Sequence, residues 1–234
     1  MPDSAARSSL SEAIYAGLRM ALMSGSYEPG DRINIRKLAL LSRTSPTPVR
    51  EAIMQLVREG ALELKPGYQP RVPILSPERY EKIREVRAPL ERLAAELAAQ
   101  HAPPDLAEAL LRLDQRFIEA ERDGDWKAAT GANQEFHFAI YRASRNEVLV
   151  RAIESLWLLT GPVVHSQYAA NARRPPRTAL HGQIIDALCR HAAQEAGDLV
   201  VQDMRQGAAV ILEHLRAPGP KRRAGRRAAS QPGA

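Results

Sequence analysis

The sequence is poor in cysteine and in aromatic residues, and both shortages exclude classes of protein. The single cysteine, Cys189, excludes an intrachain disulfide framework and a cysteine-rich zinc module. Aromatic residues make up only 5% of the 234 positions, but 44% are hydrophobic, which is enough for a globular core. No apolar run approaches the roughly 20 residues of a membrane span, and the N-terminus lacks a secretory-signal pattern. We therefore expect a soluble, cytoplasmic protein that has no membrane partner.

The whole chain has a net charge of +6, and its positive charge is concentrated at its two ends. Residues 1–75 hold ten basic and seven acidic side chains, and residues 217–234 hold five basic and no acidic ones. Residues 76–216 between them hold 18 basic and 20 acidic side chains. Basic ends around a near-neutral middle favour an anionic partner such as nucleic acid. The Pro-, Gly- and Arg-rich tail, 217–234, is predicted to be disordered.

Residues 8–75 predict three helices followed by a hairpin. Apolar residues recur at helical spacing in three stretches, 10–22, 35–41 and 49–57. Ser45 fits the N-cap of the third helix and Pro46 its first turn. A turn-rich stretch, 65–70, then separates two short extended runs. This order is that of a winged helix-turn-helix domain with a small β-hairpin wing, whose third helix enters the DNA major groove.

Residues 76–216 predict a second, all-helical domain. Apolar residues repeat at steps of three and four with no strand pattern, which indicates an antiparallel bundle of six or seven helices. Pro89 lies inside the first of these helices and should kink it, and Gly161-Pro162 should break or kink the fourth. The fold class is therefore mainly α, with a winged helix-turn-helix domain followed by an antiparallel helical bundle.

Three stretches of the first domain resemble the DNA-binding domain of GntR-family bacterial transcription regulators: Glu28-Pro29-Gly30-Asp31-Arg32-Ile33, Leu38-Ala39 and the run from Ser45 to Ile53. The second domain resembles the FadR-type effector domain of that family through Arg87, Leu90-Glu91 and Glu135-Phe136-His137. The resemblance covers about residues 8–216. It implies a regulator that binds DNA sequence-specifically and is not an enzyme.

The resemblance implies DNA contacts from Arg36, Ser45, Thr47 and Arg50. Thr47 and Arg50 also follow from the residues alone, because they stand off the apolar face in the first turns of the third helix, the end that meets bases and phosphates. The alternative for this pair is a helix cap and a solvated charge. Two departures from the family affect the surface. Pro46 replaces an Arg that some members have, and Gln69 replaces a wing glycine whose turn Gly67 would then make.

Three polar residues are predicted to face the interior of the bundle: Asn133, His137 and His181. They need partners, because an unpaired buried polar group costs about 1–3 kcal/mol. Many FadR-type domains resemble one another in binding a divalent metal through an Asp, a His four residues later and two further His. Here Asn133 stands at the Asp position and Gly207 at the last His, and Asp203 is a candidate substitute. A site for zinc, manganese or nickel and a set of mutual hydrogen bonds both remain open.

Arg87 is a candidate clamp for the carboxylate of an effector, because the resemblance places it in the ligand pocket and its planar fork matches a carboxylate. The alternative is an ion pair with Glu91 in the same helix. The candidate effector-binding residues are thus Arg87, Asn133, His137 and His181.

The leading hypothesis is a homodimeric repressor that binds a palindromic operator and is controlled by a small carboxylate-bearing metabolite. The metabolite would shift the population of domain arrangements, so that the two recognition helices no longer fit the operator. One alternative is a constitutive DNA-binding protein whose bundle only dimerises. A metal-dependent enzyme is a weaker alternative, because no set of three firm ligands with a general base is visible.

Overall fold

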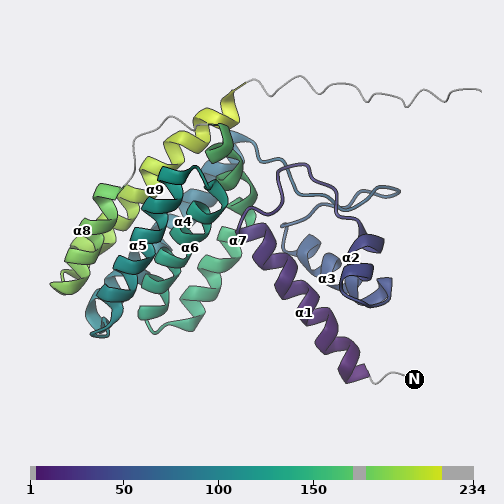
Figure 1. Ribbon diagram of the computed structural model, residues 1–234, viewed down its shortest axis with the longest axis horizontal. Helices are drawn as coiled ribbons and strands as arrows, with labels where there is room; N and C mark the ends of the chain where they lie inside the picture. The colour runs from purple at the N-terminus through teal and green to yellow at the C-terminus, as the bar shows by residue number, and fades with distance from the viewer. Residues whose placement is uncertain (1–3, 171–177, 218–234) are drawn as a thin grey trace, which may run out of the picture.

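The computed structural model describes residues 4–170 and 178–217, and its regular structure in this part of the chain is helical (Figure 1). The helices are α1 (Ser4–Met23), α2 (Ile35–Leu41), α3 (Pro46–Arg58), α4 (Pro77–His101), α5 (Leu106–Asp123), α6 (Trp126–Ala143), α7 (Glu147–Ala170), α8 (Thr178–Cys189) and α9 (Ala193–Arg216). The predicted mainly α fold is confirmed. Six of these helices, α4 to α9, lie side by side as a bundle, and α1 to α3 lie to one side of it.

Helices α1, α2 and α3 form the predicted helix-turn-helix arrangement. The inner face of α3 consists of Val49, Ile53 and Leu56, which are fully buried and follow the three-four spacing seen in the sequence. Ser45 is the N-cap residue of α3 and Pro46 begins the helix, as expected. Helix α1 packs against both α3 and α7, so it connects the DNA-binding part to the bundle.

The predicted β-hairpin wing is only partly formed, because the described residues contain isolated bridges and no strand. Glu63 and Arg71 exchange two backbone hydrogen bonds of 2.8 and 2.9 Å, and Arg71 also bridges to Arg32. Pro70 and Pro73 flank this pair and carry no backbone N–H, so the ladder cannot extend along that leg. The wing is therefore a loop of two extended segments, in which Arg71 forms one isolated bridge with Glu63 and one with Arg32.

The expected turn at the tip of the wing is present. Tyr68 donates its backbone N–H to the Lys65 carbonyl at 3.0 Å, and Gly67 has a φ of +75°. Proline in the second position and a left-handed glycine in the third are the pattern of a type II turn. Gly67 thus makes the turn that the absence of glycine at position 69 had left in question.

Helix α4 is the central element of the bundle and packs against α6, α7, α8 and α9. It begins at an N-cap, Ser76, whose hydroxyl accepts a 3.2 Å hydrogen bond from the backbone N–H of Arg79. Its inner face includes four alanines with no exposed surface, which lets neighbouring helices approach closely: Ala94, Ala95, Ala98 and Ala99.

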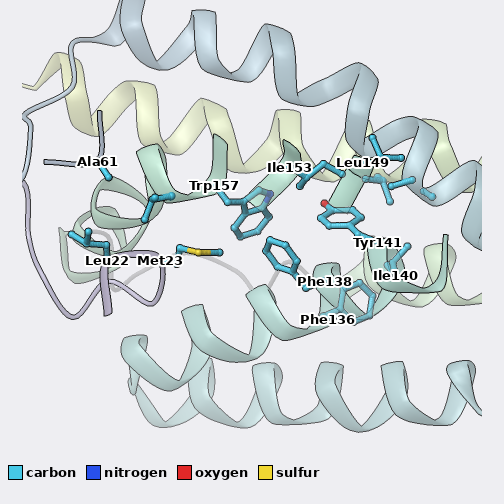
Figure 2. Packing of buried hydrophobic residues seen from close by; sticks show 14 of the residues in the cluster. Leu22, Met23, Ala61, Phe136, Phe138, Ile140, Tyr141, Leu149, Ile153 and Trp157 are labelled. Atoms are coloured by element: carbon cyan, nitrogen blue, oxygen red, sulfur yellow. The ribbon is translucent and has the colours of Figure 1, made fainter. Parts of the chain in front are cut away.

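One hydrophobic core runs from the bundle into α1. Figure 2 shows Phe136, Phe138 and Tyr141 of α6 packed near Trp157 of α7, with Leu22 and Met23 of α1 at the other side of the cluster. All of these side chains are less than 10% exposed. The bundle and α1 therefore share buried apolar contacts.

Helix α7 bears on two expectations. Of the break or kink expected at Gly161-Pro162, the break is wrong, because α7 continues as a helix to Ala170. Its segment Glu147–Ser166 is also 20 residues long with a mean hydropathy of 1.3, which meets the length and composition of a membrane span. The sequence reading missed this segment because charged Arg151 and Glu154 interrupt it. Half of the apolar window is buried inside the protein, and core helices of soluble proteins meet the same criterion.

Residues 218–234, most of the tail predicted to be disordered, lie outside the described residues.

Candidate DNA-binding surface and effector pocket

The four residues expected to contact DNA lie together on the surface formed by α2 and α3. Arg36 is exposed on α2, and Ser45, Thr47 and Arg50 are exposed at the N-terminal end of α3. The Ser45 side chain makes no capping hydrogen bond, and neither arginine forms an ion pair within the described residues. These side chains are therefore available to an external partner, and the helix N-terminus beside them favours a phosphate.

The wing forms the other side of this surface. A hollow of about 560 Å³ lies between α2, α3 and the wing, and Arg36, Pro46 and Arg50 line it opposite Tyr68 and Gln69. Tyr68 is 73% exposed and stands at the wing turn. Sequence reasoning did not select Tyr68, although an aromatic residue next to a Pro-Gly turn in a basic segment was a usable signal. Pro46 adds only an apolar surface where a base-reading side chain could stand.

Inside the bundle, Arg87 makes the ion pair with Glu91 that was the alternative to an effector clamp. Arg87 Nε donates to Glu91 Oε1 at 2.7 Å, and Arg87 Nη1 donates to Thr160 Oγ1 at 3.0 Å. The guanidinium also lies 4.5 Å from the centre of the Trp157 ring. Burial is the largest single influence and would lower the pKa of Arg87, but the charge and the hydrogen bond of Glu91, with smaller contributions from Tyr80 and Tyr141, together raise that pKa. The arginine is thus a fixed cation at the wall of a pocket.

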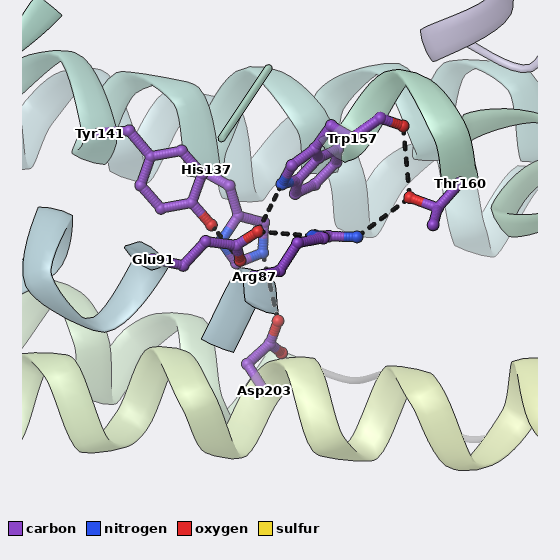
Figure 3. Close-up of polar contacts among 7 residues, drawn as sticks. All are labelled: Arg87, Glu91, His137, Tyr141, Trp157, Thr160 and Asp203. Atoms are coloured by element: carbon purple, nitrogen blue, oxygen red, sulfur yellow. Dashed lines mark hydrogen bonds and ion pairs between the residues drawn. The ribbon is translucent and has the colours of Figure 1, made fainter. Parts of the chain in front are cut away.

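Glu91 is the centre of this network, as Figure 3 shows. Besides Arg87, it accepts hydrogen bonds of 2.7 Å from the Tyr141 hydroxyl and from Trp157 Nε1. Burial raises the pKa of Tyr141 well above its usual value, and the Glu91 charge raises it further, so the phenol stays protonated and donates. Three donors satisfy one buried carboxylate, which is what allows a charge to remain in the core.

The two histidines expected to meet inside the bundle do so, and Asp203 joins them. His137 from α6, His181 from α8 and Asp203 from α9 are all buried, and one nitrogen or oxygen atom of each lies within 4.8 Å of the others. His137 Nε2 lies 3.2 Å from Asp203 Oδ2, and Figure 3 shows Asp203 directed at the His137 ring. His137 Nδ1 is buried and has no hydrogen-bond partner in the described part of the chain.

A second carboxylate, Asp114 of α5, orients His181. Its Oδ1 lies 2.7 Å from His181 Nδ1. A carboxylate on one ring nitrogen fixes the tautomer and leaves the other nitrogen as an acceptor or a metal ligand. Sequence reasoning missed Asp114, although it falls between Leu110 and Phe117 on the buried face of α5. An acidic residue inside an apolar face was the signal.

The residues present fit a divalent cation in chemical type. Two imidazoles and one carboxylate are the nitrogen and oxygen ligands that zinc, manganese and nickel accept. The unpartnered His137 nitrogen and the Asp114-oriented His181 ring are both features of such sites. Asp203 thus lies at the cluster where the sequence offered it as a substitute for the missing fourth ligand.

A small cavity of about 60 Å³ adjoins this cluster. Arg87, Asn133, His137 and Asp203 line it, together with Gly207, the position where a further histidine was expected. Asn133 therefore faces the same cavity as His137, whereas His181 lies behind it. The cavity is far smaller than the roughly 300–1,000 Å³ typical of small-molecule pockets.

The sequence matches two family models. Residues 10–70 match bacterial regulatory proteins of the gntR family, and residues 82–206, more than half of the chain, match the FCD domain. The chain belongs to the GntR family of bacterial regulators. It carries the FCD type of all-helical second domain, so it is a transcription regulator and not an enzyme.

Several curated regulators are similar to this GntR-family protein. The HTH-type transcriptional regulator McbR of Escherichia coli (strain K12) is 35% identical over 163 residues, which are 69% of this chain and 73% of that protein. The Nta operon transcriptional regulator of Aminobacter aminovorans is 35% identical over 57% of this chain and 63% of its own. A probable D-xylose utilization operon transcriptional repressor of Paenarthrobacter nicotinovorans is 28% identical over 76% of each chain.

Solved structures agree in fold. Escherichia coli McbR/YncC superposes with a TM-score of 0.81 at 28% identity, covering 88% of this chain and 98% of that one. A putative GntR regulator from Rhodococcus sp. RHA1 superposes with a TM-score of 0.73 at 22% identity, over 88% and 98% of the two chains. The arrangement of helix-turn-helix and helical bundle is thus shared with solved members of the family.

Proposed function

We propose that this GntR-family regulator is a homodimeric, cytoplasmic repressor that releases a palindromic operator when a small carboxylate-bearing metabolite binds its bundle. Residues 8–75 would form the DNA-binding domain and residues 76–216 the effector-binding and dimerisation domain. The observation that carries the proposal is the exposed set Arg36, Ser45, Thr47 and Arg50 on α2 and α3, of which Arg36 and Arg50 line one hollow, together with a buried polar pocket in the bundle. The similar regulator of Paenarthrobacter nicotinovorans is itself a probable transcriptional repressor, of the D-xylose utilization operon.

The DNA-binding part of the proposal rests on geometry. Arg50 and Thr47 stand at the exposed N-terminal end of α3, where a major-groove helix meets base edges, and Arg36 and Tyr68 flank it. The arginines would contact phosphates or guanine edges, and the wing would contact the adjacent backbone.

The effector would bind at the wall that Arg87, Asn133, His137 and Asp203 share. Arg87 is held at a fixed position by Glu91 and Thr160, so it supplies a preorganised positive charge for a carboxylate. A divalent metal held by His137, His181 and Asp203 would supply a second positive charge beside it, with Asn133 as a further oxygen donor. The cavity of about 60 Å³ must widen to admit a metabolite, so binding would select a more open arrangement of the bundle.

A short path connects this pocket to the DNA-binding part. Thr160 accepts from Arg87, and the next residue, Gly161, packs against the backbone of Leu22 and Met23 at the end of α1. A shift of α7 at Thr160 would therefore move α1 and the recognition helix with it.

The homodimer is supported by an apolar stripe on the outer face of α4. Val86, Pro89 and Leu93 are exposed at spacings of three and four, and the two larger side chains are 52% and 42% exposed. Exposed apolar side chains in a row favour an interface between copies of the chain. Two recognition helices related by a two-fold axis would read a palindrome.

The direct test of the DNA-binding surface is an affinity measurement on the operator, found by selection from random duplex DNA. Arg50→Ala and Arg36→Ala should each weaken binding by about tenfold or more, because each removes a charge-assisted contact. Arg112→Ala on α5, an exposed arginine in the bundle, is the matched control and should bind as the unmodified protein does. Unchanged affinity in Arg50→Ala would show that the recognition-helix assignment is wrong.

The metal part has its own test. The metal content of the purified protein is measured, and its melting temperature is followed through chelation and re-addition of zinc, manganese or nickel. A bound ion should raise the melting temperature, because it binds only the folded state. The rise should disappear in Asp203→Asn and His181→Gln and persist in His101→Gln, whose ring lies on the surface of α4. No metal and no response would mean that the cluster is held by hydrogen bonds alone.

A further inference from the structure

Another cavity, larger than the one at Arg87, lies where α1 meets α6 and α7. Its volume is about 360 Å³, and none of the residues proposed above for DNA, metal or effector lines it. This junction cavity is bounded by Tyr15, Arg19, Met20 and Met23 on one side and by Gly131, Phe138, Arg142 and Glu154 on the other. A volume in this range accommodates a small organic molecule.

The junction cavity has an apolar wall that can adapt its shape. Met20 is 68% exposed at its edge, while Met23 and Phe138 form its buried floor. Methionine side chains are flexible and adjust to irregular ligands. Gly131 leaves the opposite side open, because a Cβ atom added there would meet nothing within 4 Å.

The charges around the cavity favour an anionic ligand. Both acidic side chains are already paired, Glu154 with Arg19 at 3.5 Å and Glu135 with Arg116 at 2.9 Å. In the described part of the chain, Arg142 pairs with no acid and lies over the Phe138 ring at 5.9 Å. Arg19 Nε is buried and has no hydrogen-bond partner there. Two guanidinium groups thus retain donors that an acceptor in the cavity would satisfy.

We infer that the junction cavity is a second ligand site for an amphipathic monoanion, a molecule with an apolar body and one carboxylate or sulfonate. The apolar body lies against Met20, Met23 and Phe138, and the anionic group accepts hydrogen bonds from Arg19 and Arg142. This inference goes beyond the proposed function, because neither the operator contacts nor the pocket at Arg87 depends on it.

A ligand at this site joins the two parts of the protein. Arg19 and Met20 belong to α1, which packs on the recognition helix, whereas Phe138 and Arg142 belong to the bundle. Phe138 also packs edge-on against Trp157 at 5.3 Å, and Trp157 lines the cavity at Arg87. Occupancy of the junction cavity therefore fixes α1 relative to the bundle and changes one wall of the effector pocket.

The test uses anilinonaphthalene sulfonate, a fluorescent apolar monoanion, and its uncharged parent, phenylnaphthylamine, with the full chain. Gly131→Met fills the cavity and should abolish binding of both probes at this site. Arg19→Met and Arg142→Met should each weaken the sulfonate by about tenfold and leave the uncharged probe within about twofold, because only the charge-assisted contact is lost.

Matched controls identify the site. Gly182→Met changes a helical glycine of α8 that also has open space around its Cβ position, and it should bind both probes as the unmodified protein does. Arg36→Met removes an arginine from the hollow beside the recognition helix, where the probes could also bind, and it should leave the binding of both probes unchanged although it weakens operator binding. Helical circular dichroism verifies that each variant is folded.

Two results would overturn the inference. One is sulfonate binding that survives Gly131→Met, or that falls equally in Arg36→Met, which would locate the probe elsewhere. The other is the absence of probe binding together with a Gly131→Met variant of altered molar mass, which would mean that a second copy of the chain covers the cavity.

Discussion

Glu91 is a charged side chain that is only 2% exposed, and its three hydrogen-bond donors come from three helices. The pair with Arg87 has the same spacing and the same 2.7 Å distance as the pair Arg92–Glu96, one turn further along α4. The burial differs, since the Arg92 and Glu96 side chains are 35% and 28% exposed, and Arg92 also pairs with Asp198 of α9. The two pairs therefore compare a buried ion pair with a solvated one inside a single helix.

We predict that Glu91→Gln destabilises the protein by about 3 kcal/mol, because it leaves the Arg87 charge buried without a counter-charge. Glu96→Gln should cost far less, because water solvates Arg92 and Asp198 still pairs with it when residue 96 is neutral. Urea unfolding of both variants measures the difference. Equal losses would show that burial does not determine the strength of the Arg87–Glu91 pair.

Half of the polar cluster was predictable from the sequence, and the other half was not. The four-residue spacing of Asn133 and His137 placed them on one helix face, and Asp203 was identified as one turn from the expected ligand position. Thr160 and Asp114 were not found, because they reach Arg87 and His181 from helices 73 and 67 residues away along the chain. Spacing within one helix reveals a shared face, but only packing brings helices together.

At the level of secondary-structure elements, the contact between α7 and α1 allows almost no substitution. A Cβ atom added to Gly161 would lie 2.5 Å from the Leu22 carbonyl oxygen and 2.7 Å from the Met23 Cα. These are backbone atoms, which cannot rotate away as a side chain does. One turn further along α7, His165 lies so close to Gly25 that a Cβ atom added there would be 2.1 Å from the His165 Cβ.

Gly161→Ala should therefore cost about 2 kcal/mol of folding free energy through overpacking, and it should push α1 away from α7. Gly182→Ala provides the control, because its added methyl group meets nothing and should stabilise α8 by about 1 kcal/mol. Thermal unfolding of the two variants gives both values. A Gly161→Ala variant as stable as the parent would mean that the two helices separate freely.

The same contact should respond to pH through His165. Burial lowers the pKa of His165 from 6.5, and Lys127 lowers it further, while Glu28 acts in the opposite direction. The unfolded chain then binds the proton more readily, so the stabilisation is present above pH 6.5 and is lost as pH falls through the native value. Between about pH 7.5 and about pH 5, the urea midpoint of the parent should fall further than that of His165→Gln. An equal fall of the urea midpoint in the parent and in His165→Gln would contradict a role for this histidine.

Helices were easier to predict than the wing. Helix α3 followed directly from its apolar spacing and its Ser-Pro start, because both signals are local. The wing did not become a two-stranded ladder, because Pro70 and Pro73 remove donors on both sides of Arg71. Helix α7 extended past Pro162, because its packing against neighbouring helices outweighs the local tendency of proline to end a helix.

At the level of the whole molecule, α4 has one face in the core and an apolar stripe on the other. Its outer residues Val86 and Leu93 are exposed although the helix packs against four others of the bundle. A single recognition helix reads too few base pairs to select a genomic site, so a second copy is needed for specificity. We propose the stripe as the surface that would bind that copy.

The combined variant Val86→Asp, Leu93→Asp should sediment as a monomer and lose about tenfold or more of its operator affinity, because charge repels the stripe from its copy. Leu111→Asp is the matched control, since Leu111 is a 56% exposed leucine on α5 away from the stripe. Sedimentation velocity and operator titration measure the two effects. If the combined variant is still a dimer, the interface lies on another face of the protein.

The small size of the cavity at Arg87 has a consequence for rates. A space of about 60 Å³ is closed to a metabolite, so a ligand must wait for the bundle to open before it can enter. The observed binding rate should then level off as ligand concentration rises, because the opening rate sets the limit and not the encounter rate. The proposed effector would then act no faster than the bundle opens.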